Sequence, residues 1–262
     1  MPSALPEEPL ELGELTHDAI AGDFRITQRK HGHRYSIDDV ITAQVAASAR
    51  PFAARCLELG SGIGSVLLML AYRLPAARFV AVEAQRNSFE LLTRNVAQNA
   101  LQERVTTLRG DLRECVTPSL GSFDLVTGTP PYVLPGQATP STDAQRAYAR
   151  QEYRGGVEDY ILAASRVLAP AGLVAVCCDA RRPDRVEQAA LQCELGIVSQ
   201  CDVYPRSGRP ALFSVFTLGQ GPASRTRSAF VARTENGARS EQYLALREFF
   251  GMPRPSAEAP SP

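Results

Sequence analysis

Apolar and polar positions divide most of the chain into short apolar runs and longer stretches in which apolar residues recur every three or four positions. The short runs, bounded by Gly, Pro and polar residues, predict strands, and the longer stretches predict amphipathic helices. The expected strands are 54–59, 78–83, 105–108, 123–127, 173–178, 197–204 and 211–218. The expected helices are 66–74, 87–99, 157–168 and 184–195.

This order of elements predicts an α/β fold with a doubly wound, mostly parallel sheet. Strands that alternate with helices form βαβ units, and the strands of such units run parallel. The last two runs, 197–204 and 211–218, have no helix between them, so we expect an antiparallel pair. The prediction is a seven-stranded, Rossmann-like sheet with an antiparallel last strand. Ligands of such sheets bind beyond the carboxyl ends of the strands, where the strand order reverses.

The two ends of the chain differ in composition from the part between them. Residues 1–20 are acidic and residues 253–262 are rich in Pro, Ser and Ala, so we expect flexible tails at 1–20 and 251–262 around one domain at 21–250. The formal net charge is zero and 44% of the residues are hydrophobic, which argues against a polybasic protein and against a disordered chain.

Several classes of protein are disfavoured by what the sequence lacks. It contains no apolar stretch of about 18 residues and no signal peptide, so we expect a cytoplasmic protein without a membrane segment. The six cysteines have no metal-ligand spacing, and we expect reduced thiols and no bound metal.

A glycine-rich turn follows the first expected strand and opens the first expected helix. Glycine lets the backbone turn tightly and lets a ligand approach closely. The dinucleotide fingerprint requires a third glycine where this chain has Ser65, so the turn fits a ligand with an amino-acid tail and no pyrophosphate. Acids end the next two strands, where they can accept hydrogen bonds from ribose hydroxyls and from an adenine amino group. The expected cofactor-binding residues here are Glu58, Gly60, Ser61, Gly62, Gly64, Glu83 and Asp111.

The tetrapeptide Thr129-Pro130-Pro131-Tyr132 follows the fourth expected strand. It resembles the Asn/Asp-Pro-Pro-Tyr signature of methyltransferases that act on planar amino groups. The lone pair of such an amine is conjugated, and acceptors aimed at its hydrogens favour the pyramidal geometry needed for attack. In the signature the Asn or Asp side chain and the carbonyl of the first proline are these acceptors, and the aromatic ring stacks on a flipped base. The resemblance implies that all four residues are catalytic, with a shorter and less negative acceptor at Thr129.

Further segments narrow the resemblance to one family. They are FRITQ at 24–28, GHRYSID at 32–38, ARQE at 149–152, RGG at 154–156 and a closing segment at 243–250. Together they resemble the bacterial tRNA (adenine-N6)-methyltransferases that modify position 37 of a valine tRNA. The resemblance covers nearly the whole chain and implies a class I methyltransferase fold, S-adenosyl-L-methionine as cofactor and tRNA as partner. It also implies that Asp38 lies near the methionine end of the cofactor.

Basic residues gather on both sides of these motifs. Arg34 precedes the glycine turn, and Arg150 and Arg154 follow the catalytic motif. In the predicted fold they flank the mouth of the pocket and can neutralise phosphates, while Tyr132 offers a ring on which an RNA base can stack. We therefore expect these three arginines to bind substrate, although a solvated charged surface explains them equally well. We expect a monomer.

The sequence leaves the acceptor molecule open. The expectation is an S-adenosylmethionine-dependent N-methyltransferase that acts on the N6 amine of an adenine in tRNA. Pro-Pro-Tyr motifs also occur in enzymes that methylate protein glutamines or ribosomal RNA bases. Because Thr129 stands in place of Asn or Asp, a catalytically silent RNA-binding or scaffold protein that binds the cofactor is a second alternative. A nicotinamide dehydrogenase is a third, against which Ser65 and the Pro-Pro-Tyr motif both argue.

Overall fold

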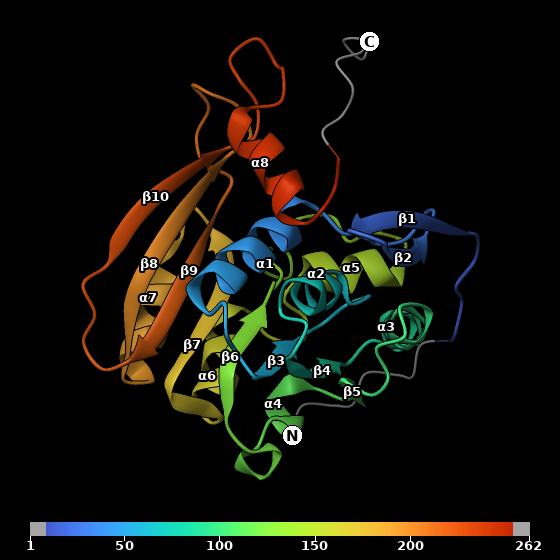
Figure 1. Ribbon diagram of the computed structural model, residues 1–262, viewed down its shortest axis with the longest axis horizontal. Helices are drawn as coiled ribbons and strands as arrows, with labels where there is room; N and C mark the ends of the chain where they lie inside the picture. Colours follow the sequence, from blue (N-terminus) through green and yellow to red (C-terminus); the bar gives the residue numbers. More distant parts are fainter. Residues whose placement is uncertain (1–8, 254–262) are drawn as a thin grey trace.

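An eight-stranded sheet forms the centre of the structure, a computed structural model that describes residues 9–253 (Figure 1). Its strands are β3 (Arg55–Leu59), β4 (Arg78–Glu83), β5 (Val105–Arg109), β6 (Phe123–Gly128), β7 (Leu168–Asp179), β8 (Leu195–Tyr204), β9 (Phe213–Gln220) and β10 (Thr226–Val231). They lie in the order β10-β8-β9-β7-β6-β3-β4-β5. β9 is antiparallel to both of its neighbours, and the other pairs are parallel.

Helices cover both faces of the sheet and make the fold doubly wound. On one face lie α1 (Ile37–Ala49), α2 (Ser65–Arg73) and α3 (Arg86–Gln98), with α8 (Glu241–Phe249) against α1. On the other face lie α4 (Leu112–Cys115), α6 (Val157–Ser165) and α7 (Pro183–Gln192). α5 (Ala144–Arg150) belongs to the long connection between β6 and α6. No helix within residues 9–253 is both long enough and apolar enough to cross a membrane.

Alternating side chains of the strands divide the hydrophobic core between the two helical layers. In β7, Ala175 and Cys177 pack in the layer of α1 and α2, whereas Val174 and Val176 pack in the layer of α6 and α7. Successive side chains of a strand point to opposite faces, so a strand buried on both faces needs a continuous apolar run. For this reason the continuous apolar runs of the sequence located the central strands.

The α/β fold and its antiparallel closing pair are confirmed, but the described sheet has eight strands and not seven. The additional strand, β10, pairs in parallel with β8 at the edge of the sheet. Most of its residues are exposed, so it lacks the apolar run of a buried strand. The strand expected at 173–178 is longer in the structure, because β7 begins at Leu168, and its pairing with β6 is irregular near that start.

An N-terminal hairpin corrects the expected domain boundary. β1 (Leu15–Ala21) and β2 (Phe24–Arg29) pair antiparallel and contact α2 and α3, with Ile20 and Ile26 buried. The expected flexible segment 1–20 is therefore wrong for residues 15–20, because acidic and polar residues on the outer face conceal the alternating apolar positions of β1. The expected tails at 1–8 and 254–262 lie outside the described residues.

The order of the strands brings the functional segments to one edge of the sheet. From β3 the chain continues to β4 and β5 on one side and then returns to β6 on the other side of β3. Because these four strands are parallel, the glycine turn after β3, the acids after β4 and β5, and the expected catalytic motif (Thr129–Tyr132) after β6 all begin at this edge. Loops diverge at such a reversal and leave space for a ligand.

Candidate functional site

The glycine turn is closed by the carboxylate at the end of β4. Gly60, Gly62 and Gly64 have φ of 57°, 56° and 87°, a conformation that residues with a Cβ rarely adopt. Glu83 accepts hydrogen bonds from the backbone N–H of Gly62 (2.7 Å) and from that of Gln85 (2.6 Å). These contacts hold the turn against the tip of β4 and fix the orientation of the Glu83 carboxylate.

A cavity lies beyond the ends of β3, β4 and β5. It is lined by residues of the glycine turn, by the acids after the next two strands and by the first residue of the catalytic motif: Gly60, Ser61, Gly62, Glu83, Asp111 and Thr129. The structure thus brings these six predicted residues, which come from four strand ends, into one place. We call it the first cavity.

Asp111 caps α4 and forms an ion pair with Arg113. Its carboxylate accepts from the backbone N–H of Arg113 (2.9 Å) and pairs with its Nη2 (2.7 Å). Partial burial raises the pKa of Asp111, but the hydrogen bonds and charge of Arg113 outweigh this effect, and the pKa lies below its ordinary value. The carboxylate is therefore ionised at neutral pH. Two oxygens offer about four lone-pair sites, so capacity for a ligand donor remains.

The first cavity is acidic and fits a ligand that carries positive charge. Burial raises the pKa values of Glu83 and Asp39, both in its wall, to about 7. The Oε2 atom of Glu58, which is buried beside the turn, has no hydrogen-bond partner among the described residues. Burial raises the pKa of Glu58 well above its ordinary value. Space is also present, because a Cβ added to Gly62 would meet no atom within 4 Å. Buried carboxylates without a cation are unfavourable, and a cationic ligand relieves that cost.

The expected catalytic motif is anchored by the hydroxyl of its tyrosine. The Tyr132 oxygen lies 2.8 Å from Cys177 Sγ on β7 and 3.2 Å from Asp38 Oδ2 at the start of α1. Burial raises the pKa of Tyr132 well above its ordinary value, so the hydroxyl keeps its proton and donates it to one of these acceptors. The anchor and the two prolines restrict the motif to one conformation.

A second cavity adjoins the motif. Thr129, Pro130, Pro131 and Tyr132 all line it. It shares five lining residues with the first cavity, namely His33, Asp39, Thr129, Pro131 and Ala149. Groups held in the two cavities would therefore both contact these shared side chains.

Three of the expected cofactor-binding residues do not line the first cavity. Asp38 lines the second cavity, while its neighbour Asp39 lines both. Glu58 is 3% exposed and lies behind the turn, and Gly64 is the N-cap of α2. Helix geometry explains the first result, because residues at the start of α1 point in different directions only one position apart.

One of the three arginines expected to bind substrate lies in the wall of the first cavity and not of the second. Arg154 lines the first cavity, where its guanidinium lies 4.4 Å from the centre of the Tyr148 ring. It does not line the second cavity, whereas Arg34 and Arg150 do. Tyr148 and Asp39, both in the wall of the first cavity, belong to no recognisable motif, and sequence reasoning missed them.

Comparison with known proteins decides the family. Residues 56–146 match a methyltransferase domain. The chain is 32% identical over 201 residues to a tRNA1(Val) (adenine(37)-N6)-methyltransferase from Aeromonas hydrophila, and the match covers 76% of this chain and 82% of that protein. The protein belongs to this methyltransferase family. A member from Tolumonas auensis is 26% identical over 237 residues, which covers 89% of this chain and 96% of that protein.

Solved structures support the same fold at lower sequence identity. A predicted O-methyltransferase from Agrobacterium tumefaciens superposes with a TM-score of 0.62 and 19% identity, covering 82% of this chain and 98% of that one. A tRNA methyltransferase from M. jannaschii gives a TM-score of 0.55 and 13% identity over 79% of this chain and 55% of that one. The fold and the methyltransferase family inferred from the sequence are confirmed.

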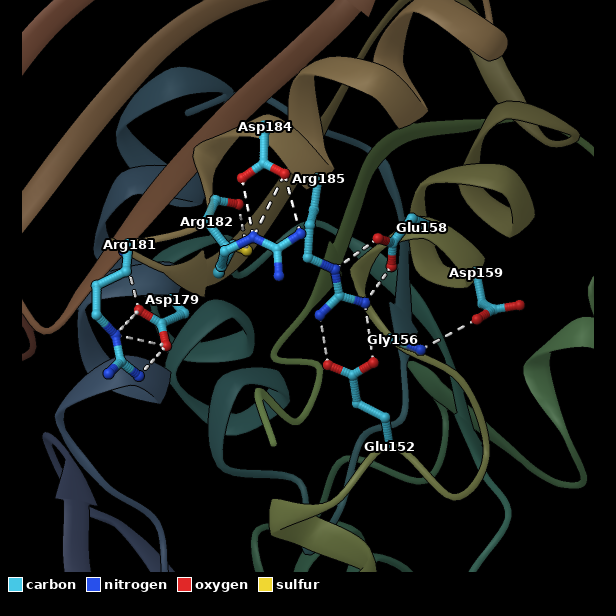
Figure 2. Close-up of polar contacts among 10 residues, drawn as sticks. Glu152, Gly156, Glu158, Asp159, Asp179, Arg181, Arg182, Asp184 and Arg185 are labelled. Atoms are coloured by element: carbon cyan, nitrogen blue, oxygen red, sulfur yellow. Dashed lines mark hydrogen bonds and ion pairs between the residues drawn. The ribbon is translucent and has the colours of Figure 1, made fainter. Parts of the chain in front are cut away.

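An ion-pair cluster is connected to the expected catalytic motif through the residue that follows it. The Arg185 guanidinium on α7 pairs with Glu152 (2.6 and 2.9 Å) and also with Glu158 at the start of α6, as Figure 2 shows. The side chains of Arg185 and Glu152 are 13% and 5% exposed. The backbone N–H of Glu152 donates to the carbonyl of Val133, the residue after the motif (3.0 Å). Arg185 thus connects the motif to the helical layer.

Proposed function

We propose that this protein transfers a methyl group from S-adenosylmethionine to the N6 amine of the adenine at position 37 of a valine tRNA. The observation that carries the proposal is the wall shared by the two cavities, which contains Asp39, Thr129 and Pro131. A cofactor in the first cavity and a base in the second have their reacting groups at this wall. The acceptor follows the name of the relatives, tRNA1(Val) (adenine(37)-N6)-methyltransferases.

S-adenosylmethionine suits the first cavity because its sulfonium and ammonium groups match the acidic lining. When bound, it supplies an electrophilic methyl group. The Glu83 carboxylate accepts hydrogen bonds from ribose hydroxyls, and Asp111 accepts from the adenine amino group. The backbone at Gly60 and Gly62 holds the methionine end. Arg154 itself lines this cavity and lowers the pKa values of Glu83 and Asp111.

The acceptor base enters the second cavity against the catalytic motif. The two prolines and the anchored Tyr132 form a stiff wall along the base, which excludes water and restricts its orientation. The amine donates hydrogen bonds to the Thr129 hydroxyl and to the Pro130 carbonyl, and its lone pair then faces the first cavity. Because positive charge leaves the sulfur during transfer, catalysis depends mostly on positioning.

Basic residues at the rim of the second cavity suit an RNA acceptor. Arg34, Arg146 and Arg150 line it beside the motif. Arg34 pairs with Asp18 (3.0 Å), and Arg146 Nε donates to the Gly32 carbonyl (2.9 Å), so both are held in place. Arginine binds phosphate oxygens in a planar, bidentate geometry, which suits the backbone of an anticodon loop.

Methyl transfer from labelled S-adenosylmethionine to separate pools of acceptor tests the proposed function. We expect incorporation into tRNA, with N6-methyladenosine at position 37 of valine tRNA found by mass mapping of nucleosides. The same nucleoside should be absent from tRNA of cells that lack the protein and should return on complementation. Incorporation only into ribosomes or release factor would assign a different acceptor. Tight binding of S-adenosylhomocysteine without incorporation into any pool would indicate a catalytically silent protein.

The raised pKa of Glu83 predicts that cofactor binding depends on pH. Burial raises this pKa to about 7, and the backbone hydrogen bonds of Gln85 and Gly62 oppose the shift. Below about pH 7 the carboxyl carries a proton that it must release before it accepts from both ribose hydroxyls. The affinity for S-adenosylhomocysteine should be constant at high pH and fall by up to about tenfold per pH unit below pH 7.

Isothermal titration calorimetry between about pH 5.5 and pH 8.5 at constant ionic strength measures this dependence. Glu83→Gln should flatten the profile, and any remaining slope should come from Asp39, whose pKa is also raised to about 7. A dissociation constant for wild-type protein that stays the same across the whole range would contradict the prediction.

Arg150 is expected to act on RNA affinity more than on turnover. Its side chain lines the second cavity and its residue is exposed. Arg150→Ala should raise the KM for tRNA by about 3- to 10-fold and reduce the slope of log affinity against log salt by about 1, with kcat nearly unchanged. Steady-state kinetics at several salt concentrations measure both effects. Arg94→Ala is the matched control, because Arg94 pairs with Glu90 on α3 and lines neither cavity; equal effects of the two substitutions would exclude a specific contact.

A further inference from the structure

The Thr129 hydroxyl is backed by a buried carboxylate from another part of the chain. Thr129 Oγ1 donates a hydrogen bond to Asp39 Oδ1 at 3.2 Å. Asp39 lies in the first turn of α1, 90 residues earlier in the sequence, and it lines both cavities. The catalytic motif itself offers only a hydroxyl at this position, and the carboxyl group in contact with that hydroxyl comes from α1.

We propose that Asp39 and Thr129 act as one acceptor for the substrate amine, in which the Asp39 carboxylate supplies the negative charge that the motif lacks. This rests on the proposed function, because it concerns the same amine. A hydroxyl has one proton and two lone pairs, so Thr129 can donate to Asp39 and still accept from the amine. Hydrogen bonds in such a chain polarise one another, which makes the hydroxyl a better acceptor.

Contacts on every side fix the orientation of the Asp39 carboxylate. Its Oδ2 accepts a hydrogen bond from the backbone N–H of Ser36 (3.0 Å), and this bond is part of the capping box of α1. Its Oδ1 accepts a hydrogen bond from the Thr129 hydroxyl. The Ser65 side chain at the start of α2 also hydrogen-bonds to it. Asp39 is 7% exposed. A group held by a rigid helix and fixed hydrogen bonds needs no reorganisation during reaction.

The charged groups that face Asp39 are themselves acidic. Asp38 on the same helix raises the pKa of Asp39, and Asp39 in turn raises that of Glu58 on β3. Burial contributes most of the shift, and the pKa of Asp39 is about 7. A carboxyl group with this pKa can take up a proton from a reacting amine and return it to water at neutral pH.

The chemical step balances with these two residues alone as proton carriers. The nitrogen lone pair forms the new N–C bond, and the pair of the S–C bond stays on sulfur, which becomes neutral. The nitrogen then carries a positive charge and releases one proton to Thr129 Oγ1, while the hydroxyl proton passes to Asp39 Oδ1. The products are a neutral methylated amine and a neutral Asp39 carboxylic acid, which later loses its proton to water.

Single-turnover methyl transfer to tRNA tests the pair. We expect Asp39→Asn and Thr129→Ala each to lower the rate constant by about 100-fold. The double variant should be no more than about threefold slower than the slower single variant, because residues that act as a unit are not additive. Thr129→Ser keeps the hydroxyl and should stay within about threefold of the wild type.

A rescue separates this function from a structural one. Thr129→Asn places an amide oxygen in the motif, so in the Asp39→Asn background it should raise the rate constant at least about tenfold above Asp39→Asn alone. A carboxylate that only stabilised the start of α1 would not be replaced in this way. Asp159→Asn is the matched control, since Asp159 occupies the same capping-box position of α6 (3.0 Å to the N–H of Gly156) and should leave the rate unchanged.

Binding of S-adenosylhomocysteine and melting temperature are measured for every variant. Dissociation constants within about threefold of the wild type show that the rate losses arise after cofactor binding. Asp39→Asn at the wild-type rate, multiplicative losses in the double variant, or no rescue by Thr129→Asn would each overturn the pair. If the wild type methylates a protein glutamine and not tRNA, the proposed function fails, and the same variant series on that amide decides the pair. If the wild type methylates no pool, both are overturned.

Discussion

Replacing Glu83 with alanine is expected to weaken binding of S-adenosylhomocysteine by at least about 100-fold. Two hydrogen bonds from ribose hydroxyls to a carboxylate contribute about 1.5–3 kcal/mol each, and about 2.7 kcal/mol is 100-fold in affinity. The substitution also removes the acceptor of the Gly62 and Gln85 N–H groups, so the glycine turn loses its contact with β4. Both effects act on the same cavity and in the same direction.

Calorimetric titration of wild type, Glu83→Ala, Glu83→Gln and Glu90→Ala measures this effect. The Gln variant keeps one acceptor oxygen without charge and should lose about tenfold in affinity. Glu90 on α3 pairs with Arg94 at the surface, and its removal should leave affinity unchanged. If Glu83→Ala bound within about threefold of the wild type, the ligand would not lie on Glu83, and the assignment of the first cavity would be wrong.

Arg185→Ala is expected to produce the largest loss of stability, about 3–5 kcal/mol in the free energy of unfolding. Removing one member of a buried ion pair leaves the other uncompensated, and the side chain of Glu152 is only 5% exposed. For a chain of this size the melting temperature should fall by about 5–15 °C. The backbone N–H of Glu152 is hydrogen-bonded to the carbonyl of Val133, the residue after the catalytic motif. Turnover should therefore fall as well, because the motif is held less firmly.

Thermal and denaturant unfolding, each followed with and without S-adenosylhomocysteine, measure the loss. Arg182→Ala is the control at the N-cap of the same helix, since Arg182 and Asp184 form an exposed pair and the change should stay within about 0.5 kcal/mol. Arg185→Met combined with Glu152→Leu should recover most of the stability, because a buried ion pair can be replaced by apolar side chains of similar size. A melting temperature of Arg185→Ala within about 2 °C of the wild type would show that the ion pairs of Arg185 contribute little to the free energy of unfolding.

The parts of the site that sequence reasoning located are those in which local chemistry is sufficient. The turn after β3 needs glycines because its backbone has positive φ, and the Pro-Pro-Tyr motif is recognisable because it is contiguous. Glu83 and Asp111 could be predicted as site residues because parallel strands end at the same edge of the sheet. Each of these inferences depends on residues within one strand and the loop that follows it.

The residues that sequence reasoning missed act across large separations. Tyr148, which was missed, and Arg154, which was expected to bind substrate, line the first cavity because the connection between β6 and α6 folds back over it. Asp38 and Asp39 are both aspartates, so the sequence does not distinguish them. Only the direction of each side chain from α1 places Asp39 against Thr129. The edge strand β10 and both strands of the hairpin, β1 and β2, were missed because partly exposed strands carry no continuous apolar run.

The sequence by itself determined the doubly wound sheet, the glycine turn, the acids at the strand ends, the catalytic motif and the methyltransferase family. These follow from periodicity and from short motifs, which a chain displays before it folds. Only the tertiary structure decided which carboxylate stands behind Thr129, how Tyr132 is anchored and which arginine faces which cavity. Such contacts join distant segments, and their geometry depends on packing that no local pattern encodes.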